Sequence, residues 1–455
     1  MALSGRFGQL SPRLVAGVSA LCIALGLLAG VNPAYGVLAA VALLFVVVTF
    51  MDVTVGMIMF TAVSFLDLAT SSGSFSGTKV VGLVVVASWL ARTMTGRGAD
   101  VGSFVSANPA LAVALLAMLG WAALSALWAF SAGAALTGAA SYAQDMLLVP
   151  IMYSAVRNRD QAVWVVTAYV VGAVLSGAYG LVHPTASGID TGRLTGTTDA
   201  NFEAAVLAAA IPLLVSLMGA IRRSARLKCL ALLGVLILFA SLVQTLSREG
   251  LLALAAVLLG AVVFGGKWRR QAAVLLVVGA VGTAGYYAVL APASSLQRVT
   301  SSSTSGRSSI WTVATRVFER HPLLGVGTGN FILVSRQYIN QPGAVSAQYI
   351  VQSPLVTHNS YLEALTDLGI PGLLTLLAVL GWALAAAVRA TRLFEQAGDE
   401  QMELLSRGVV LALIAILASD FFVANAQAKY LWLLIALCPA LLRLGHRELE
   451  AADSR

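Results

Sequence analysis

The chain has 455 residues, of which 59% are hydrophobic and 11% are charged, and its mean hydropathy is +0.87. Soluble globular domains are about 45–50% apolar and about 25% charged, so this composition excludes an ordinary soluble protein and predicts an all-α integral membrane protein. The net charge of +8 fits basic loops that face anionic membrane lipids, and we therefore expect no nucleic-acid partner.

Apolar runs long enough to cross a bilayer recur along most of the chain. A spanning helix needs about 20 mostly apolar residues. The candidate helices lie near residues 14–32, 36–51, 53–69, 79–95, 109–130, 135–155, 161–182, 201–221, 227–246, 249–265, 271–290, 370–389, 408–424 and 430–443. Only a tight turn at Met51-Asp52 separates the second and third runs, so the sequence predicts about 12–14 transmembrane helices. The first run resembles a signal peptide, but the spans that follow it favour an uncleaved helix.

The distribution of basic residues predicts which side of the membrane each loop faces. With the N-terminus inside, most of the 28 Lys and Arg residues fall in cytoplasmic loops, and the C-terminus is cytoplasmic too. The arginines that remain outside, against this rule, lie in or near residues 183–200, 246–250 and 291–357. Because a charged side chain at the membrane edge needs a partner, these arginines indicate an anionic ligand on the outer face.

One long polar segment divides the chain. We expect a bundle of transmembrane helices over residues 1–290, an outer-face loop over 291–357, C-terminal transmembrane helices over 358–445 and a cytoplasmic tail over 446–455. The loop is therefore the largest part of the protein that is predicted to lie outside the membrane.

An amphipathic helix is predicted inside this outer loop, from Arg307 to Arg320. Its apolar face consists of Ile310, Val313, Ala314, Val317 and Phe318. Arg316 and Arg320 are four residues apart and share the other side. That side is either a solvated basic face or a face that lies over a lipid headgroup.

A glycine-rich sequence, Gly-Val-Gly-Thr-Gly at 325–329, follows this helix. It resembles a nucleotide-binding loop, but it lacks the Lys-Ser/Thr ending, and no alternating strand–helix pattern surrounds it. It is also predicted to lie on the outer side, where nucleoside triphosphates are scarce. We therefore reject the nucleotide interpretation.

His358 is the strongest candidate for catalysis. It lies where the outer loop returns to the membrane, just before an apolar helical pattern that begins at Tyr361. Histidine is the side chain best suited to proton transfer near neutral pH. The alternative is an interfacial histidine that only makes hydrogen bonds.

Two outer arginines are candidates for binding phosphate. Arg248 lies at a very short outer turn, where its permanent charge needs an anion or a water-filled cavity, unless Glu249 neutralises it. Arg193 lies in a glycine-rich loop in which Asp199 or Asn201 could cap the next helix, but Arg193 itself has no evident local partner. Arginines from separate elements could converge on a diphosphate, because their forked donors match phosphate oxygens.

No metal or cofactor site is predicted. Cys22, Cys229 and Cys438 lie far apart in apolar runs, where they resemble small buried hydrophobic residues, and the outer segments show no ligand-like spacing. The acidic residues within or beside apolar runs are Asp67, Asp145, Glu203 and Asp420. The sequence assigns no pairing among them, so glycosidase chemistry with two carboxylates is not supported.

Three stretches of residues 185–375 carry a resemblance to known proteins. They are Arg-Leu-Thr-Gly at 193–196 with the residues up to Asn201, Ser-Arg-Glu-Gly-Leu-Leu at 247–252, and a third stretch that begins with Gly-Arg at 306–307 and Trp311. This third stretch continues through His-Pro-Leu-Leu-Gly-Val-Gly-Thr-Gly-Asn-Phe at 321–331 to His-Asn at 358–359 and Gly-Ile-Pro-Gly at 369–372. In order, spacing and topology they resemble the O-antigen ligase and polymerase superfamily of bacterial envelope glycosyltransferases. The first half of the chain is similar only in its hydrophobic spans.

The resemblance implies a metal-independent, inverting transfer, without a cofactor, at the outer face of the bacterial cytoplasmic membrane. The donor would be a glycan on polyprenyl (undecaprenyl) diphosphate, and the acceptor a lipid, glycan or protein hydroxyl. Carried over by position, Arg193 and Arg248 would bind the diphosphate, Arg307 is a weaker match to the same role, and His358 would be the base. The family usually has a small residue where this chain has Glu249, which changes the charge beside Arg248.

Other functions stay open at this point. A polymerase of the same superfamily would add the glycan to another lipid-linked glycan, and the single long outer loop slightly favours a ligase. A transporter is the alternative from a different class, but transporters often carry internal repeats and broken helices near the midplane, and the sequence shows no repeat. A structural scaffold would leave His358 unexplained.

Overall fold

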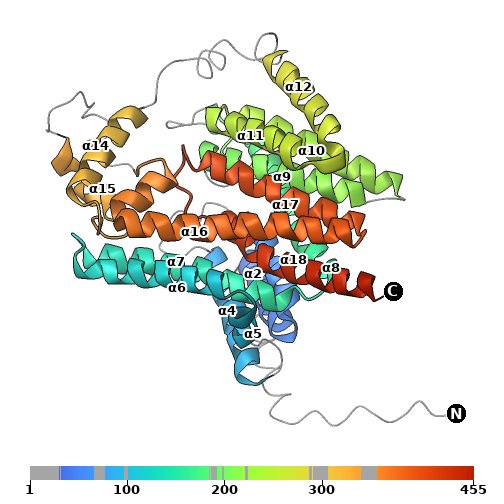
Figure 1. Cartoon of the computed structure of the whole chain (residues 1–455), viewed down its shortest axis with the longest axis horizontal. Helices are drawn as coiled ribbons and strands as arrows, with labels where there is room; N and C mark the ends of the chain where they lie inside the picture. The colour runs from blue at the N-terminus through green and yellow to red at the C-terminus, as the bar shows by residue number, and fades with distance from the viewer. Residues whose placement is uncertain are drawn as a thin grey trace.

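The computed structural model describes residues 30, 32–65, 77–96, 101–183, 185, 192–196, 199–220, 224–285, 289, 306–339 and 356–454. Within these residues all regular structure is helical (Figure 1). The first part of the chain forms α2 (Pro33–Met51), α3 (Val53–Val63), α4 (Gly77–Met94), α5 (Val101–Ala107), α6 (Pro109–Leu124), η1 (Ser125–Leu127), α7 (Ala132–Ala155), α8 (Arg159–Val182), α9 (Ala200–Ala220), α10 (Ala225–Gln244), α11 (Arg248–Phe264), η2 (Gly266–Trp268) and α12 (Arg269–Gly285). The remainder forms α14 (Arg307–Arg320), α15 (Phe331–Val334), η4 (Ser335–Tyr338), α16 (Ser360–Gln396), α17 (Glu400–Ser419) and α18 (Lys429–Asp453).

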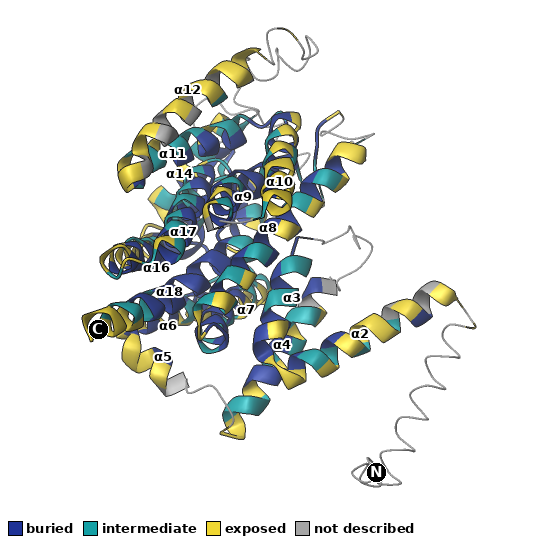
Figure 2. Ribbon diagram, turned by 90° about the vertical axis from the view of Figure 1, so that its right-hand side faces the viewer, coloured by how far each residue is buried: buried dark blue, intermediate teal, exposed yellow. Residues whose placement is uncertain are grey.

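Six helices of the described part are long and apolar enough to cross a membrane, which confirms the all-α, multi-span membrane class. They are Pro109–Leu127, Arg159–Val182, Ala200–Gly219, Ala225–Gln244, Ser360–Gln396 and Glu400–Ser419. Helix α10 has a largely exposed side (Figure 2). Its large apolar side chains Leu230 and Leu233 are exposed and suited to contact with lipid tails. The first predicted span, 14–32, lies almost wholly outside the described residues.

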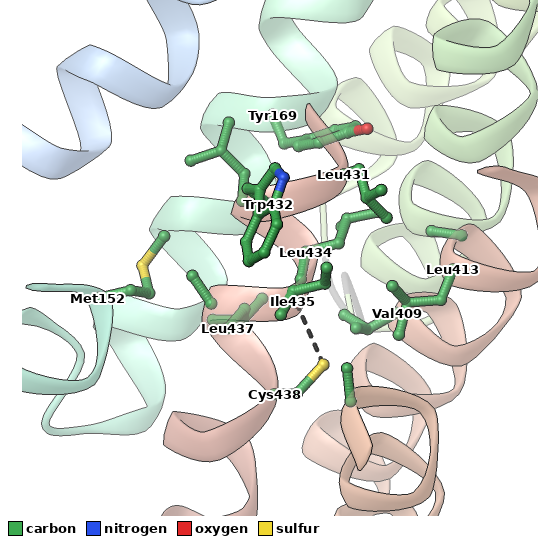
Figure 3. Packing of buried hydrophobic residues seen from close by; sticks show 14 of the residues in the cluster. Met152, Tyr169, Val409, Leu413, Leu431, Trp432, Leu434, Ile435, Leu437 and Cys438 are labelled. Carbon is green, nitrogen blue, oxygen red and sulfur yellow. Dashed lines mark hydrogen bonds between the residues drawn. The ribbon is translucent and has the colours of Figure 1, made fainter. Parts of the chain in front are cut away.

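The core of the bundle forms where α18 packs against α7 and α16, and where α9 packs along α17. Trp432, Tyr169 and Cys438 are buried there, and the Cys438 thiol donates to the carbonyl of Leu434 at 3.1 Å (Figure 3). Residues 204–210 of α9 are mostly alanine, and small residues let helices pack closely in a membrane. The prediction of a buried cysteine is confirmed for Cys438 and wrong for Cys229, which is exposed on α10.

Helix α16 differs most from the predicted spans. The sequence predicts a membrane helix from residue 370, whereas α16 begins at Ser360 and bends at Gly369, whose φ of 67° is left-handed. The segment from 370 onward is therefore the predicted span, and the polar first turns form a separate short helix at its end. Likewise α17 begins at Glu400 rather than near 408, because its first turns are too polar for a hydropathy pattern to include.

Contacts between turns define two ends of the bundle. At one end Arg159 pairs with Asp399 at 3.1 Å, which joins the α7–α8 and α16–α17 turns, and Arg443 of α18 donates to backbone oxygens of the same region. At the other end the amide of Ser360 donates to the carbonyl of Asp420 at 2.8 Å. Helices α14 and α15 lie at this second end, called here the α14 end, and the chain's C-terminus lies at the first, called the C-terminal end (Figure 1).

Candidate functional site

The N-termini of α9, α11, α14 and α16 all lie at the α14 end. Asp199 accepts from the amide of Asn201 in α9, Ser247 caps α11 by accepting from Gly250, and Asn359 caps α16 by accepting from Leu362 at 2.9 Å. Unpaired amides and the positive ends of helix dipoles favour negatively charged groups. This end of the bundle is therefore suited to an anionic ligand, provided that side chains complete the site.

An ion pair joins the first turn of α11 to the first turn of α14. The carboxylate of Glu249 contacts the guanidinium of Arg307, and the hydroxyl of Ser247 donates to the same carboxylate at 2.5 Å. Glu249 is only 4% exposed and Arg307 is largely buried. From the sequence, Glu249 was considered as the neutralising partner of the adjacent Arg248. In the structure its carboxylate pairs with Arg307, which is distant in sequence.

His358 lies close enough to this ion pair for both charges to act on it, and its backbone is strained. Its φ of 49° is left-handed, a conformation uncommon for residues other than glycine and one that clusters at functional sites. The indole of Trp311 in α14 donates to the carbonyl of Thr357 at 3.0 Å, which fixes the residue before His358 against α14. The residues on either side of His358 are therefore both held in place, Thr357 by the bond from Trp311 and Asn359 by its role as the cap of α16.

The electrostatic surroundings of His358 suit a base. Burial, together with the positive charge of Arg307, lowers the pKa of His358 below its ordinary value, and the carboxylate of Glu249 opposes this shift in part. The imidazole is therefore neutral at pH 7 and can accept a proton. His358, Arg307 and Glu249 come from three separate segments, so the fold brings together residues that the sequence could only consider one at a time.

The turn after α17 anchors the start of α16 and hence His358. The hydroxyl of Ser360 donates to the carbonyl of Val423 at 3.0 Å and accepts from the amide of Asn425 at 2.7 Å. The hydroxyl of Tyr361 donates to the carbonyl of Leu417 at 2.9 Å. These bonds hold the first turn of α16 against the end of α17.

Arg248, the first residue of α11, is half-buried beside Glu249. The helix behind it packs very tightly, because a Cβ at Gly250 would lie 2.6 Å from the Cβ of Ala204 in α9. Leu246, just before the cap, has a left-handed φ of 51°. The sharp turn and the glycine together place Arg248 at the junction of α9 and α11.

Arg193 is buried and holds this same turn. Its Nε donates to the carbonyl of Thr245 at 2.8 Å, and its Nη2 donates to the side chain of Asn201 at 2.7 Å. The expectation that Arg193 has no local partner is therefore wrong. That Arg193 binds a diphosphate stays a prediction; the contacts give it a structural role in positioning the segment that carries Arg248.

The glycine-rich segment 325–329 clamps the bend in α16. The amides of Gly329 and Phe331 donate to the carboxylate of Asp367, at 2.5 and 2.9 Å, and the amide of Gly327 donates to the carbonyl of Asp367 at 2.8 Å. A Cβ at Gly325 would lie 2.3 Å from that carbonyl, so the glycine permits the close approach. The sequence analysis did not identify Asp367, although an acid just before Gly369 in an apolar pattern, four residues after Glu363, was a usable signal.

Helix α14 has the predicted apolar face, since Ile310, Val313, Ala314 and Val317 are buried. Both alternatives for its basic side are wrong for Arg316. This residue is 7% exposed, and its guanidinium donates to the carbonyls of Tyr338 at 2.7 Å and Ile339 at 3.0 Å. Arg320 is exposed, as a solvated face requires.

The acids that the sequence left unassigned are dispersed. Glu203 accepts from the hydroxyl of Ser176 at 3.0 Å, Asp145 is buried on α7, and Asp420 is buried in the turn after α17. Asp67 lies outside the described residues. Across the described ranges, no group of three His, Cys, Asp or Glu side chains is arranged to hold a metal ion.

A comparison with protein families gives one match, over residues 233–377, to the family described as O-antigen ligase. No curated protein matches the chain. The matched region contains Arg248, Glu249, Arg307 and His358 and ends shortly after the bend in α16, whereas Arg193 precedes it. Four of the residues that meet at the α14 end thus lie in the region that matches this family, and the match supports membership of the chain in the O-antigen ligase superfamily.

Proposed function

We propose that the protein transfers a glycan from a polyprenyl diphosphate carrier to a hydroxyl of an envelope acceptor, as a ligase of the O-antigen type. One observation carries the proposal. His358, held in a left-handed conformation, lies beside the buried Glu249–Arg307 pair within the matched region. A neutral imidazole can act as a base, and a nearby arginine can stabilise an anionic leaving group.

The reaction follows from these groups. His358 takes the proton of the acceptor hydroxyl as its oxygen bonds to the anomeric carbon from the face opposite the diphosphate. The bond between that carbon and the diphosphate oxygen breaks, and its electron pair leaves with the polyprenyl diphosphate. Arg248 and Arg307 stabilise the negative charge that develops on this oxygen. Attack from the opposite face inverts the configuration at the anomeric carbon, and Arg193 holds the turn that presents Arg248.

The site would lie at the outer face of the bacterial cytoplasmic membrane, with the polyprenyl tail in the bilayer. The basic residues that the sequence predicts to be cytoplasmic, such as Arg159 and Arg443, lie at the C-terminal end, opposite to His358. This arrangement fits the positive-inside rule.

We expect a cysteine at the exposed Thr315 of α14 to react with an impermeant reagent added to intact spheroplasts. The background is a variant in which Cys22, Cys229 and Cys438 are replaced, and the matched control is Ser454→Cys at the C-terminal end, which should react only after permeabilisation. The reverse pattern would place the site on the cytoplasmic side and contradict the proposal.

A deletion strain tests the function itself. If the protein is a ligase, mass spectrometry of the envelope glycans should show polymer lost from its acceptor and retained on the polyprenyl carrier. Single repeat units on the carrier would indicate a polymerase of the same superfamily instead. Unchanged glycans on both the carrier and the acceptor would contradict either activity.

Transfer should proceed without a divalent metal ion, since Arg248 and Arg307 can donate hydrogen bonds to the oxygen on which negative charge develops. We expect the purified protein in nanodiscs to keep its transfer rate in excess chelator. Loss of activity in chelator, restored by Mg²⁺, Mn²⁺ or Ca²⁺ but not by monovalent salt of equal ionic strength, would contradict this part of the mechanism.

A further inference from the structure

Glu249 is a buried charge that the proposed reaction does not use. It is 4% exposed, and its carboxylate lies between the hydroxyl of Ser247 and the guanidinium of Arg307. Burying a carboxylate is costly unless it is paired and hydrogen-bonded, and both conditions are met here. Arg307, an arginine of the proposed diphosphate site, is therefore already paired with an anion before any ligand binds.

The charge of the ligand changes during the proposed reaction. The donor diphosphate is esterified at both ends, whereas the departing polyprenyl diphosphate has a free terminal phosphate with one more ionisable oxygen. A site that contained only arginines would bind this product more tightly than the donor. Release of the product would then limit turnover, as it does in many enzymes.

We propose that Glu249 is a resident counter-anion that competes with the diphosphate for Arg307 and so promotes release of the polyprenyl diphosphate product. This inference rests on the proposed function, because it concerns the same site. With the donor bound, Arg307 is shared between Glu249 and the phosphates. After transfer, Glu249 reclaims the guanidinium, and its repulsion of the product exceeds its repulsion of the less charged donor.

The geometry favours a role for Glu249 in product release over a purely structural ion pair between α11 and α14. Glu249 is in the first turn of α11 and Arg307 is the first residue of α14, so the pair lies at the helix N-termini where an anion is favoured. Helix α14 also has independent anchors: the Trp311 bond to Thr357 and the two bonds from Arg316 to η4 and the residue after it. The outer-loop helix therefore stays in place when the ion pair opens.

The test is Glu249→Gln in the full-length protein, in nanodiscs, with undecaprenyl diphosphate as the added product. Glutamine keeps the size of the side chain and a hydrogen bond to Ser247 but removes the charge. Removing a competing charge-assisted contact should make the product inhibit at about tenfold lower concentration. The single-turnover rate should stay near that of the wild type, while the steady-state rate falls. Glu249→Asp, which restores the charge, should recover most of the steady-state rate.

Glu319→Gln is the matched control, since it removes the same charge from an exposed position at the far end of α14 and should change neither rate. Unchanged product inhibition in Glu249→Gln with normal single turnover would overturn the inference alone. A loss of single turnover without tighter product binding would show that Glu249 only supports the structure, and would overturn it too. A wild-type protein that neither transfers glycan nor binds the product would contradict the proposed function as well.

Discussion

Replacement of His358 by asparagine should lower the rate of glycan transfer by about 10²–10⁴-fold, the usual contribution of a positioned base. Asparagine tolerates the left-handed backbone of this position better than alanine does, so the change removes the base with the least effect on folding. Binding of the lipid-linked donor should change little, because the base acts on the acceptor hydroxyl. The measurement is the single-turnover transfer rate, with donor affinity determined separately.

The pH dependence gives a second signature of this residue. The base must be neutral, so the wild-type rate should fall as the pH drops through the pKa of His358, which lies below the ordinary histidine value because of burial and Arg307. His358→Asn should lose this acid limb. His446→Asn, an exposed histidine at the C-terminal end, should keep both the rate and the limb. If well-folded His358→Asn transfers glycan at the wild-type rate, the proposed mechanism is refuted, while the match to the family is unaffected.

The arginines should behave differently from the histidine. Removing one preorganised donor to a developing oxyanion typically costs about 10²–10³-fold in rate, and we expect this from Arg248→Ala and Arg307→Ala, together with weaker donor binding. Lysine at either position should rescue only in part, since an ammonium lacks the fork that grips two oxygens. Arg320→Ala, on the exposed side of α14, is the control and should leave both quantities unchanged.

One confounding effect is specific to Arg307. Its removal leaves the buried carboxylate of Glu249 without its partner, which destabilises a protein independently of catalysis. The double variant Arg307→Ala, Glu249→Gln should regain thermal stability in detergent and stay catalytically impaired. Recovery of transfer along with stability would show that Arg307 only neutralises Glu249 and does not serve the donor.

Much of the fold follows from the sequence because few backbone conformations are possible within a lipid bilayer. Backbone groups must be paired within the membrane, so an apolar run of sufficient length becomes a helix, and α7 to α11 begin and end within about three residues of their predicted bounds. Polar first turns carry no such signal, which is why the starts of α16 and α17 were missed. The bend at Gly369 depends on the glycine-rich clamp that the intervening loop brings back to it.

The site was predictable only in part, because the sequence indicates single residues but not how the fold pairs them. His358 and Arg248 stood out because charged or titratable groups at a membrane edge need an explanation, whereas Arg307 was a candidate only through the family resemblance. Pairing, however, is a property of the folded chain. Adjacent residues suggested that Glu249 neutralises Arg248, and nothing local revealed that the start of α14 brings Arg307 to this carboxylate.

The most direct test of the account is the fate of the carrier in a reaction with purified protein, polyprenyl-diphosphate-linked glycan and an acceptor. We expect one polyprenyl diphosphate to be released for each glycosidic bond formed, with the configuration at the anomeric carbon inverted when the product is examined by NMR. Retention of configuration, release of polyprenyl monophosphate, or movement of intact donor across the membrane without any new bond would contradict the proposed function.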